Sequence, residues 1–226
     1  MSMETILGYL SELEQNNNRE WYHANKARYQ AANQAFEALL AELIARLREM
    51  DDSIPLLEPR EITFKLVRDT HFSHDKSPYN PAFRAHIGPR GKLPVPVGYY
   101  LMIKPGGRSF LGGGLFADMF KDATAMVRDS IAAHGGEWQR LVSAPAFTEF
   151  CTVEGTALKN VPRGYDANHP QAAYLKNKSW YIEVPVSEEQ LLQADFVRFA
   201  VDIFTRMQPV NAFLNRALEN FQMPTR

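Results

Sequence analysis

Apolar side chains recur at helical spacing from Arg19 to about Met50, and a pattern of this length strongly constrains the fold. A second helical pattern covers residues 4–15, and the polar run Asn16-Asn17-Asn18 separates the two, with Asn18 as the expected N-cap of the longer helix. A third long pattern follows Asp195, where Pro209 is expected to kink or split the helix. The sequence therefore predicts long helices near both ends of the chain.

The middle of the chain favours strands. Residues 62–67, 83–87, 97–103 and 180–186 are rich in β-branched and aromatic side chains and are separated by Gly and Pro. Pro105-Gly106-Gly107 is typical of a hairpin turn. Gly112-Gly113-Gly114 indicates a tight turn between a strand and a helix over residues 118–134, and the alternative is a loop whose backbone N–H groups bind an anion beside that helix. Gly135-Gly136 is expected to end that helix, with a short helix at 137–143, an irregular stretch at 145–178 and a capping box at Ser187–Gln190.

This order of elements predicts an α+β fold with a largely antiparallel central sheet, flanked by the long N-terminal and C-terminal helices. A length of 226 residues fits one domain over residues 1–226. The composition, 45% hydrophobic and 23% charged, is typical of a soluble globular protein, and the net charge of −1 argues against nucleic acid as the main partner.

Processing and membrane signals are absent from the sequence. No secretory signal and no apolar run of about 18 residues is present, so we expect a cytoplasmic protein with no membrane partner. Cys151 is the only cysteine, which excludes an intramolecular disulfide and predicts a buried, inert thiol. The sequence does not indicate an oligomeric state.

The segment from Lys65 to Tyr79, KLVRDTHFSHDKSPY, holds the densest group of polar side chains. Arg68 can bind a phosphate or carboxylate with two parallel hydrogen bonds, and Ser73, Lys76 and Tyr79 can add further contacts. Asp69 or Asp75 is the candidate acid or base for catalysis. The alternative is that these charged residues form an internal ion-pair network that fixes a long loop.

A second polar cluster opens the long helix. Asn17, Arg19, Asn25 and Lys26 are candidate ligand-binding residues, because Asn in a helix interior has a poor propensity and needs another reason to be there. At i, i+4 and i+8, Trp21, Asn25 and Tyr29 are expected to share one helical face. We expect Arg68 or Asp69 to lie within hydrogen-bonding reach of Asn17, Arg19 or Asn25, either directly or through one water molecule. The alternative is a plain helix junction with the aromatic rings in the core.

Other features carry weaker signals. His71 and His74 do not have the spacing of a metal motif, so we expect no metal site, and the sequence indicates no cofactor. The basic stretch from Leu158 to Lys178 either closes over an anionic ligand or packs as an ordinary excursion of the chain.

Taken together, these motifs resemble the domain of unknown function 2461 family, which is found in bacteria and fungi. The resemblance covers nearly the whole chain and rests on Asn16-Asn17, Arg19–Trp21, Asn25-Lys26, Tyr29, Arg68–Thr70, Phe72-Ser73, Asp75-Lys76, Pro78-Tyr79, Gly98–Tyr100, Gly112–Gly114, Arg128, Pro162–Asp166, His169-Pro170 and Leu175-Lys176. It implies a single domain and no established activity, cofactor or catalytic residue. His71 stands where the family pattern commonly has Arg, which weakens any shared role for that residue.

Two functional hypotheses follow. The first is a binding protein or enzyme for a small anionic ligand that bears phosphate or carboxylate. The second is a non-catalytic protein-interaction module, or a nucleic-acid-binding one, in which the same polar motifs are structural. The sequence alone does not decide between them, nor whether a reaction takes place.

Overall fold

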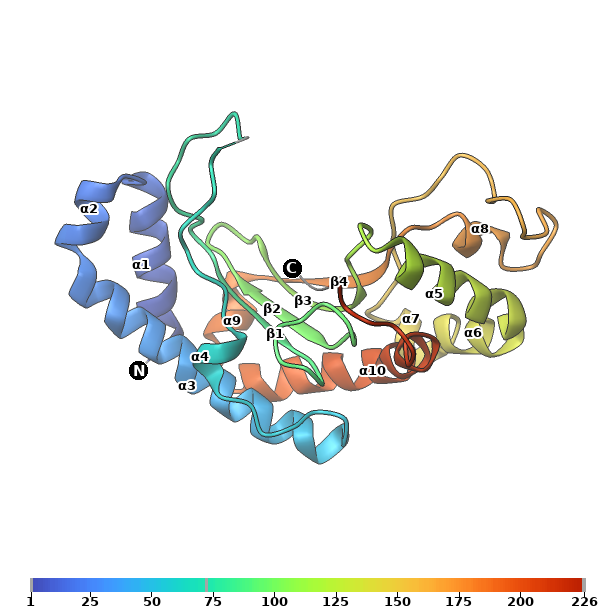
Figure 1. Cartoon of the computed structure of the whole chain (residues 1–226). Coiled ribbons are helices and arrows are strands. Elements are labelled where there is room, and N and C mark those ends of the chain that lie inside the picture. The colour runs from blue at the N-terminus through green and yellow to red at the C-terminus, as the bar shows by residue number, and fades with distance from the viewer. Residues whose placement is uncertain (1, 72, 225–226) are drawn as a thin grey trace. The chain divides into compact units, whose positions relative to one another are not determined.

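The computed structural model describes residues 2–71 and 73–224, which form ten helices and a four-stranded sheet (Figure 1). The strands are β1 (Phe83–Ile87), β2 (Tyr99–Ile103), β3 (Ser109–Leu115) and β4 (Trp180–Val186). They are antiparallel and lie in the order β1-β2-β3-β4. The prediction of an α+β fold is confirmed, with the long helices α3 (Lys26–Met50) and α10 (Phe196–Ala217) on either side of the strands in the sequence.

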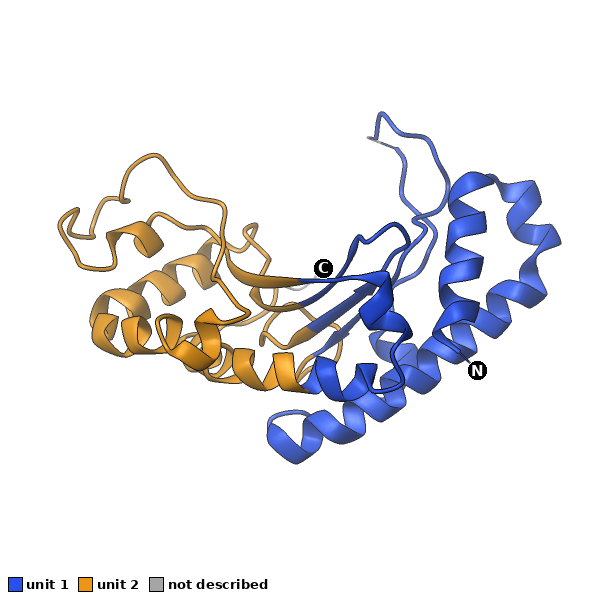
Figure 2. Ribbon diagram, turned by 180° about the vertical axis from the view of Figure 1, so that it is seen from behind, with its two compact units in different colours: residues 1–87, 100–111, 185–201 blue, residues 88–99, 112–184, 202–226 orange. Residues whose placement is uncertain are grey.

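The chain forms two compact units (Figure 2). Unit 1 comprises residues 1–87, 100–111 and 185–201, and unit 2 comprises residues 88–99, 112–184 and 202–226. Each unit thus draws on three separate stretches of the sequence. A single domain over residues 1–226 stays a prediction.

Unit 1 begins with α1 (Met3–Gln15), which packs against α3. Leu10 and Leu13 of α1 are completely buried, as are Phe36 and Leu40 of α3. These positions are the apolar stripes that the helical spacing predicted. Ser2 occupies the N-cap position of α1, but its side chain accepts no hydrogen bond from the backbone of the first turn.

The prediction of one unbroken helix from Arg19 to Met50 is wrong at Asn25. Helix α2 (Arg19–Ala24) ends there and α3 starts at the next residue, because Asn25 has φ −104° and ψ 23°. Its side-chain Nδ2 donates to the Trp21 carbonyl at 2.9 Å, so the amide caps the end of α2. Asn25 is therefore a junction residue and does not lie in a helix interior. The N-cap prediction at Asn18 is confirmed, since its side chain accepts from the Trp21 N–H at 2.9 Å.

The predicted strand over residues 62–67 is also wrong. Pro59 opens a short helix, α4 (Pro59–Ile62), at the position where proline is best tolerated. Beyond it the chain is extended but makes only single bridges, from Thr63 to Ala85 and from Val67 to Tyr79. The predictions for β1 and β2 are confirmed, although β2 starts two residues later than expected.

The three glycines at 112–114 lie inside β3, so the prediction of a strand-to-helix turn there is wrong. Gly114 has φ +79°, and a Cβ on it would lie 2.3 Å from the Trp180 carbonyl oxygen of the neighbouring strand. Glycine is needed here for a close approach between two backbones.

Unit 2 contains α5 (Lys121–Ala133), α6 (Gly135–Val142), α7 (Pro145–Thr148) and α8 (Ala172–Leu175). Helix α5 starts later than predicted and ends at the His134 cap, while Gly135 starts the next helix and does not serve as a stop signal. The stretch at 145–178, expected to be irregular, holds α7 and α8. Trp138 is completely buried and contacts Phe213 at a ring distance of 5.1 Å.

The predictions for the last elements of the chain are mostly confirmed. β4 has the predicted bounds, and α9 (Glu188–Leu192) opens with the predicted capping box between Ser187 and Gln190. Helix α10 continues through Pro209 as one element, so of the two expected effects, a kink or a split, the split does not occur.

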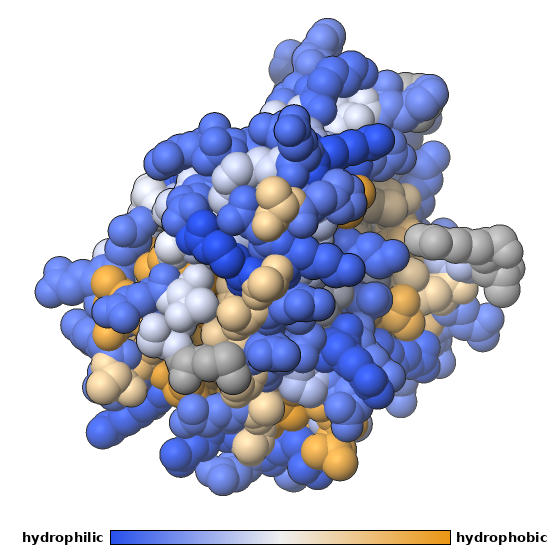
Figure 3. Space-filling model, turned by 90° about the vertical axis from the view of Figure 1, so that its left-hand side faces the viewer, coloured by the Kyte–Doolittle hydropathy of each residue, from blue (hydrophilic) through white to orange (hydrophobic). Residues whose placement is uncertain are grey.

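Two surface properties bear on function. In the part of the chain that the structure describes, no helix combines the length and apolar character that crossing a membrane requires. The face shown in Figure 3 is mostly hydrophilic, with hydrophobic side chains in small separate groups.

Candidate functional site

The Lys65–Tyr79 segment of unit 1 forms a narrow hairpin. The Arg68 N–H donates to the Pro78 carbonyl at 2.9 Å, and the Asn80 N–H donates to the Leu66 carbonyl at 2.7 Å. These bonds join the two arms and leave residues 69–77 as a loop, which Figure 1 shows projecting away from α4. Phe72, part of the motif that supported the family resemblance, lies outside the described residues.

Asn17 ties the base of this hairpin to the end of α1. Its Nδ2 donates to the Tyr79 carbonyl at 2.9 Å, and its Oδ1 accepts the Tyr79 N–H at 3.1 Å. The side chain thus pairs with the backbone of Tyr79 much as a neighbouring strand would. The Tyr79 ring stacks on Tyr22 of α2 at 4.2 Å. The two polar clusters of the sequence are therefore joined through Asn17 and Tyr79.

Most polar side chains in the loop serve the loop itself. The Asp69 carboxylate accepts the His71 N–H at 3.0 Å, and the Lys76 ammonium donates to the Thr70 carbonyl at 3.0 Å. Ser73 Oγ accepts a 3.3 Å hydrogen bond from Arg68 Nη2. These contacts fix turns and keep Asp69 and Lys76 away from any enclosed volume, which fits the structural alternative for those residues.

A polar cavity of about 430 Å³ opens at the base of the hairpin. We call it the Arg68 cavity. Its lining comes from the end of α1, from both arms of the hairpin and from the residue that follows β2, namely Glu14, Asn17, Arg68, Asp75, Ser77, Tyr79, Asn80, Pro81 and Lys104.

Arg68 and Asp75 form an ion pair at the rim of this cavity. Arg68 Nη1 donates to Asp75 Oδ2, with side chains 28% and 60% exposed. Hydrogen bonds from the Ser77 hydroxyl, from Arg68 and from the Ser77 N–H hold the pKa of Asp75 well below its usual range. A carboxylate that binds protons so weakly is a poor general base near neutral pH.

The opposite wall carries a second ion pair. Arg108 Nη2 lies 2.5 Å from Glu14 Oε2, and this contact, with a smaller contribution from nearby Lys104, lowers the pKa of Glu14. The Lys104 ammonium and the Asn80 side-chain amide form no hydrogen bond or ion pair with any residue that the structure describes. The lining thus includes the Arg68–Asp75 ion pair, Glu14 paired with Arg108, and two donor groups that form no hydrogen bond or ion pair with the described residues.

Residues 5–213 match the model of a family described as "Conserved hypothetical protein (DUF2461)". The chain belongs to this family. No curated protein and no solved structure matches it significantly.

The match extends from α1 into α10, so it includes the whole lining of the Arg68 cavity in this DUF2461 chain. The family resemblance seen in the sequence is confirmed. The family description assigns no ligand and no reaction, and the argument for function therefore depends on the geometry of the site.

The structure brings only some of the predicted site residues together. Asn17, Arg68, Asp75 and Tyr79 line the cavity, whereas six others do not, namely Arg19, Asn25, Lys26, Asp69, Ser73 and Lys76. No hydrogen bond joins Arg68 or Asp69 to Asn17, Arg19 or Asn25 in the described part of the chain.

The sequence reasoning missed Glu14, Ser77, Asn80, Pro81 and Lys104. Lys104 carried a usable signal, because Tyr100, Met102 and Lys104 alternate with buried residues at the end of a predicted strand.

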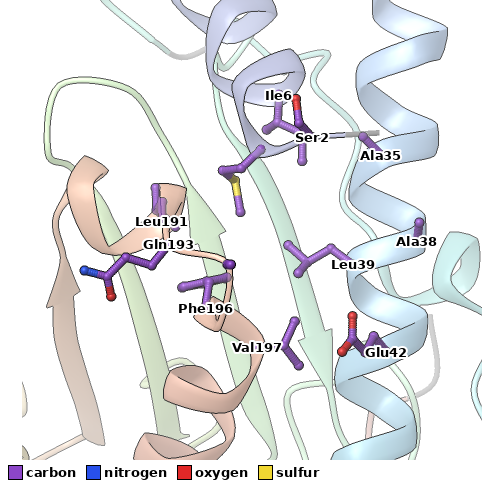
Figure 4. A pocket seen from close by; sticks show the side chains of 12 residues that line it. Ser2, Ile6, Ala35, Ala38, Leu39, Glu42, Leu191, Gln193, Phe196 and Val197 are labelled. Atoms are coloured by element: carbon purple, nitrogen blue, oxygen red, sulfur yellow. The ribbon is translucent and has the colours of Figure 1, made fainter.

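A second cavity in unit 1, of about 230 Å³, is lined mostly by apolar residues. It lies between α1, α3 and the α9–α10 segment, where Figure 4 shows Leu39, Phe196 and Val197 around it. Glu42 is its only charged lining residue. Its lining thus supplies no cation for an anionic ligand, whereas that of the Arg68 cavity includes Arg68 and Lys104, so the Arg68 cavity is the better candidate site.

The basic stretch of unit 2 is held against α5. Arg128 donates from Nε and Nη2 to the Asn177 carbonyl, at 3.1 and 2.7 Å, and Lys178 pairs with Asp118 at 3.3 Å. These contacts favour the packed-excursion interpretation. Among residues 2–71 and 73–224, no three His, Cys, Asp or Glu side chains are grouped to hold a metal ion.

Proposed function

We propose that this protein binds a small anion bearing phosphate or carboxylate in the Arg68 cavity. The observation that supports the proposal is Lys104, which lines a polar cavity and forms no salt bridge among the described residues, although its charge contributes to the low pKa of Glu14. A positive charge that is not neutralised internally attracts an anion, and a concave site limits competition from solvent.

Three donors would contact the anion. Lys104 supplies a point charge, Asn80 supplies an amide N–H, and Arg68 supplies the guanidinium N–H groups that Asp75 does not occupy. Asp75 already binds Arg68 as a ligand carboxylate would, and its side chain is 60% exposed. An entering anion can therefore share or replace that contact at little desolvation cost.

The electrostatics favour binding over acid–base catalysis. Asp75 has a low pKa, Asp69 lies outside the cavity, and Glu14 is committed to Arg108. The proposal therefore assigns Asn17 and Tyr79 to the walls of the site and assigns no residue to proton transfer.

Isothermal titration of the full chain with inorganic phosphate, methyl phosphate and succinate tests this proposal. We expect at least one of these anions to bind, with an affinity that falls as salt is added. Lys104→Met should weaken binding about tenfold or more. Lys26→Met is the matched control, since Lys26 is an exposed lysine of the same unit outside the cavity. No binding, or equal loss in both variants, would exclude the proposed site.

A further inference from the structure

A row of aromatic side chains crosses the sheet in unit 1. It consists of Phe64, Tyr100 and Phe110, and we call it the aromatic row. The Tyr100 ring stacks on Phe110 at 5.6 Å with an interplanar angle of 20°, and Phe64 lies 6.1 Å from Tyr100. The Arg84 guanidinium lies over the Phe64 ring at 5.6 Å. Four residues distant in sequence thus form one continuous surface.

This surface lies on the face of the sheet that α3 does not cover. Phe83 points to the other face, where it stacks on Phe36 of α3 at 5.1 Å. Along β2, Leu101 and Ile103 are completely buried, whereas Tyr100 and Met102 are only half-buried. All three rings of the aromatic row are likewise half-buried. Aromatic rings that keep part of their faces in water can stack on a flat ligand.

The aromatic row leads toward the Arg68 cavity. Tyr100, Met102 and Lys104 follow one another at alternate positions of the extended chain, so they share a face of the sheet. Lys104 also lines the cavity. Two residues of an extended chain span about 7 Å, so the backbone of Lys104 lies about 7 Å from that of Met102 and about 14 Å from that of Tyr100, whose ring stacks on Phe110.

We propose that the ligand of this site is a phosphate monoester that carries a planar ring, with the phosphate at Lys104 and Arg68 and the ring on Phe110 and Tyr100. This inference rests on the proposed function, and it narrows the ligand from any small anion to one chemical class. The site would bind the two ends of such a molecule by different physical means, charge at one end and stacking at the other.

Charge and size both fit a small ring-bearing monoester. Arg84 adds positive potential beside the rings, and its Nε is buried without a hydrogen-bond partner in the described structure. A phosphate is doubly charged near neutral pH and is therefore attracted more strongly than a carboxylate by a cluster of cations. A cavity of about 430 Å³ accommodates one such group and not an extended polymer.

Calorimetric titration of the full chain with 1-naphthyl phosphate and methyl phosphate tests the inference, because the two differ only in the ring. Stacking on an aromatic side chain changes affinity by about 5- to 150-fold. We therefore expect wild type to bind the naphthyl ester about tenfold more tightly than the methyl ester, within that range.

Two variants locate the ring. Phe110→Leu keeps an apolar side chain of similar size and should remove the preference for the naphthyl ester while leaving methyl phosphate binding unchanged. Lys104→Met should weaken binding of both esters. A thermal melt of each variant establishes that it is folded.

The other outcomes are distinct. Equal affinity for both esters in wild type would overturn this inference and leave the proposed function intact. A naphthyl preference that survives both Phe110→Leu and Tyr100→Leu would place the ring elsewhere and overturn it too. If wild type binds neither ester, the inference of a phosphate monoester is overturned. If wild type also fails to bind inorganic phosphate and succinate, the proposed function is overturned as well.

Discussion

The side-chain amide of Asn17 hydrogen-bonds to both backbone groups of Tyr79, donating at 2.9 Å and accepting at 3.1 Å. The contact joins the end of α1 to the base of the hairpin that bears Arg68. A single asparagine therefore fixes the position of one wall of the Arg68 cavity relative to the other.

Replacing Asn17 with alanine should destabilise the protein by about 1–3 kcal/mol, because a half-buried N–H and C=O both lose their partner. Asn16→Ala is the matched control, since its side chain makes one local bond to the Glu12 carbonyl, and its cost should be about 1 kcal/mol or less. Urea denaturation measures both. Equal losses would mean that the link to Tyr79 contributes little.

Arg68→Ala should lower the free energy of unfolding less than Asn17→Ala does. Its partner Asp75 is mostly exposed, so water replaces the lost ion pair and no carboxylate is stranded in the interior. The same denaturation experiment compares the variants. A loss larger than that of Asn17→Ala would indicate that Arg68 is mainly an architectural residue of the hairpin.

The parts of the fold that were predictable depend on local signals. β4 follows from a run of β-branched and aromatic residues, and β1 from a short segment bounded by Pro81 and Gly88. The Asn18 and Ser187 caps follow from side chains that bond within their own helix turn. The break at Asn25 was missed because apolar periodicity continues across it, and a single residue with altered dihedrals leaves that pattern intact.

The site was only partly predictable for a related reason. Arg68, Asp75 and Tyr79 stood out because they share one dense polar segment, and Asn17 because it lies in an unusual asparagine run. Lys104 and Glu14 are ordinary charged residues in their local sequence. Only the three-dimensional arrangement, which places the end of β2 beside the end of α1 in unit 1, brings them into the same cavity.

Adjacent glycines of β3 should differ in their tolerance of a methyl group. Gly114→Ala combines a positive φ with a Cβ placed 2.3 Å from the Trp180 carbonyl oxygen, so we expect a loss of about 3 kcal/mol or more. At Gly113 the nearest atoms are Met207 Sδ at 3.1 Å and Oδ1 of the hydrogen-bonded Asn211 at 3.3 Å, so Gly113→Ala should cost about 1–3 kcal/mol, less than Gly114→Ala because its φ is not positive.

Thermal or urea unfolding of the two glycine variants measures the difference. A similar cost for both would indicate that β3 and β4 can separate locally to admit the methyl group.

Cys151 should react slowly with a thiol reagent in the native protein. The residue is buried, and burial raises the pKa of its thiol to about 11, so very little thiolate exists near neutral pH. Labelling with a disulfide reagent should be slow without denaturant and rapid and complete in urea. Fast stoichiometric labelling of the folded protein would contradict this expectation.

Alkaline pH should destabilise unit 1 through its tyrosine cluster. Tyr22 packs against Tyr29 and Tyr79, and burial first, then these neighbours, raises its pKa to about 12. An unfolded tyrosine ionises near pH 10, so between about pH 10 and 12 the unfolded chain loses a proton that the folded chain keeps. The contribution of the protonated Tyr22 to the free energy of unfolding is fully present below about pH 10 and disappears as the pH rises through about 12. Because the Tyr22 ring is partly exposed, we expect the free energy of unfolding to decrease by about 1 kcal/mol or less per pH unit in this range.

Tyr22→Phe should flatten this dependence, because phenylalanine has no proton to release in either state. The measurement is urea denaturation of wild type and variant at several pH values from about 8 to 11, together with ultraviolet titration of tyrosinate. Tyr9→Phe serves as the companion variant. The Tyr9 hydroxyl is buried and has no hydrogen-bond partner in the described residues, so its removal should leave stability unchanged or raise it by about 1 kcal/mol at neutral pH. An identical alkaline slope in wild type and Tyr22→Phe would show that Tyr22 ionises normally and that its ring is less enclosed than its stacking on Tyr79 implies.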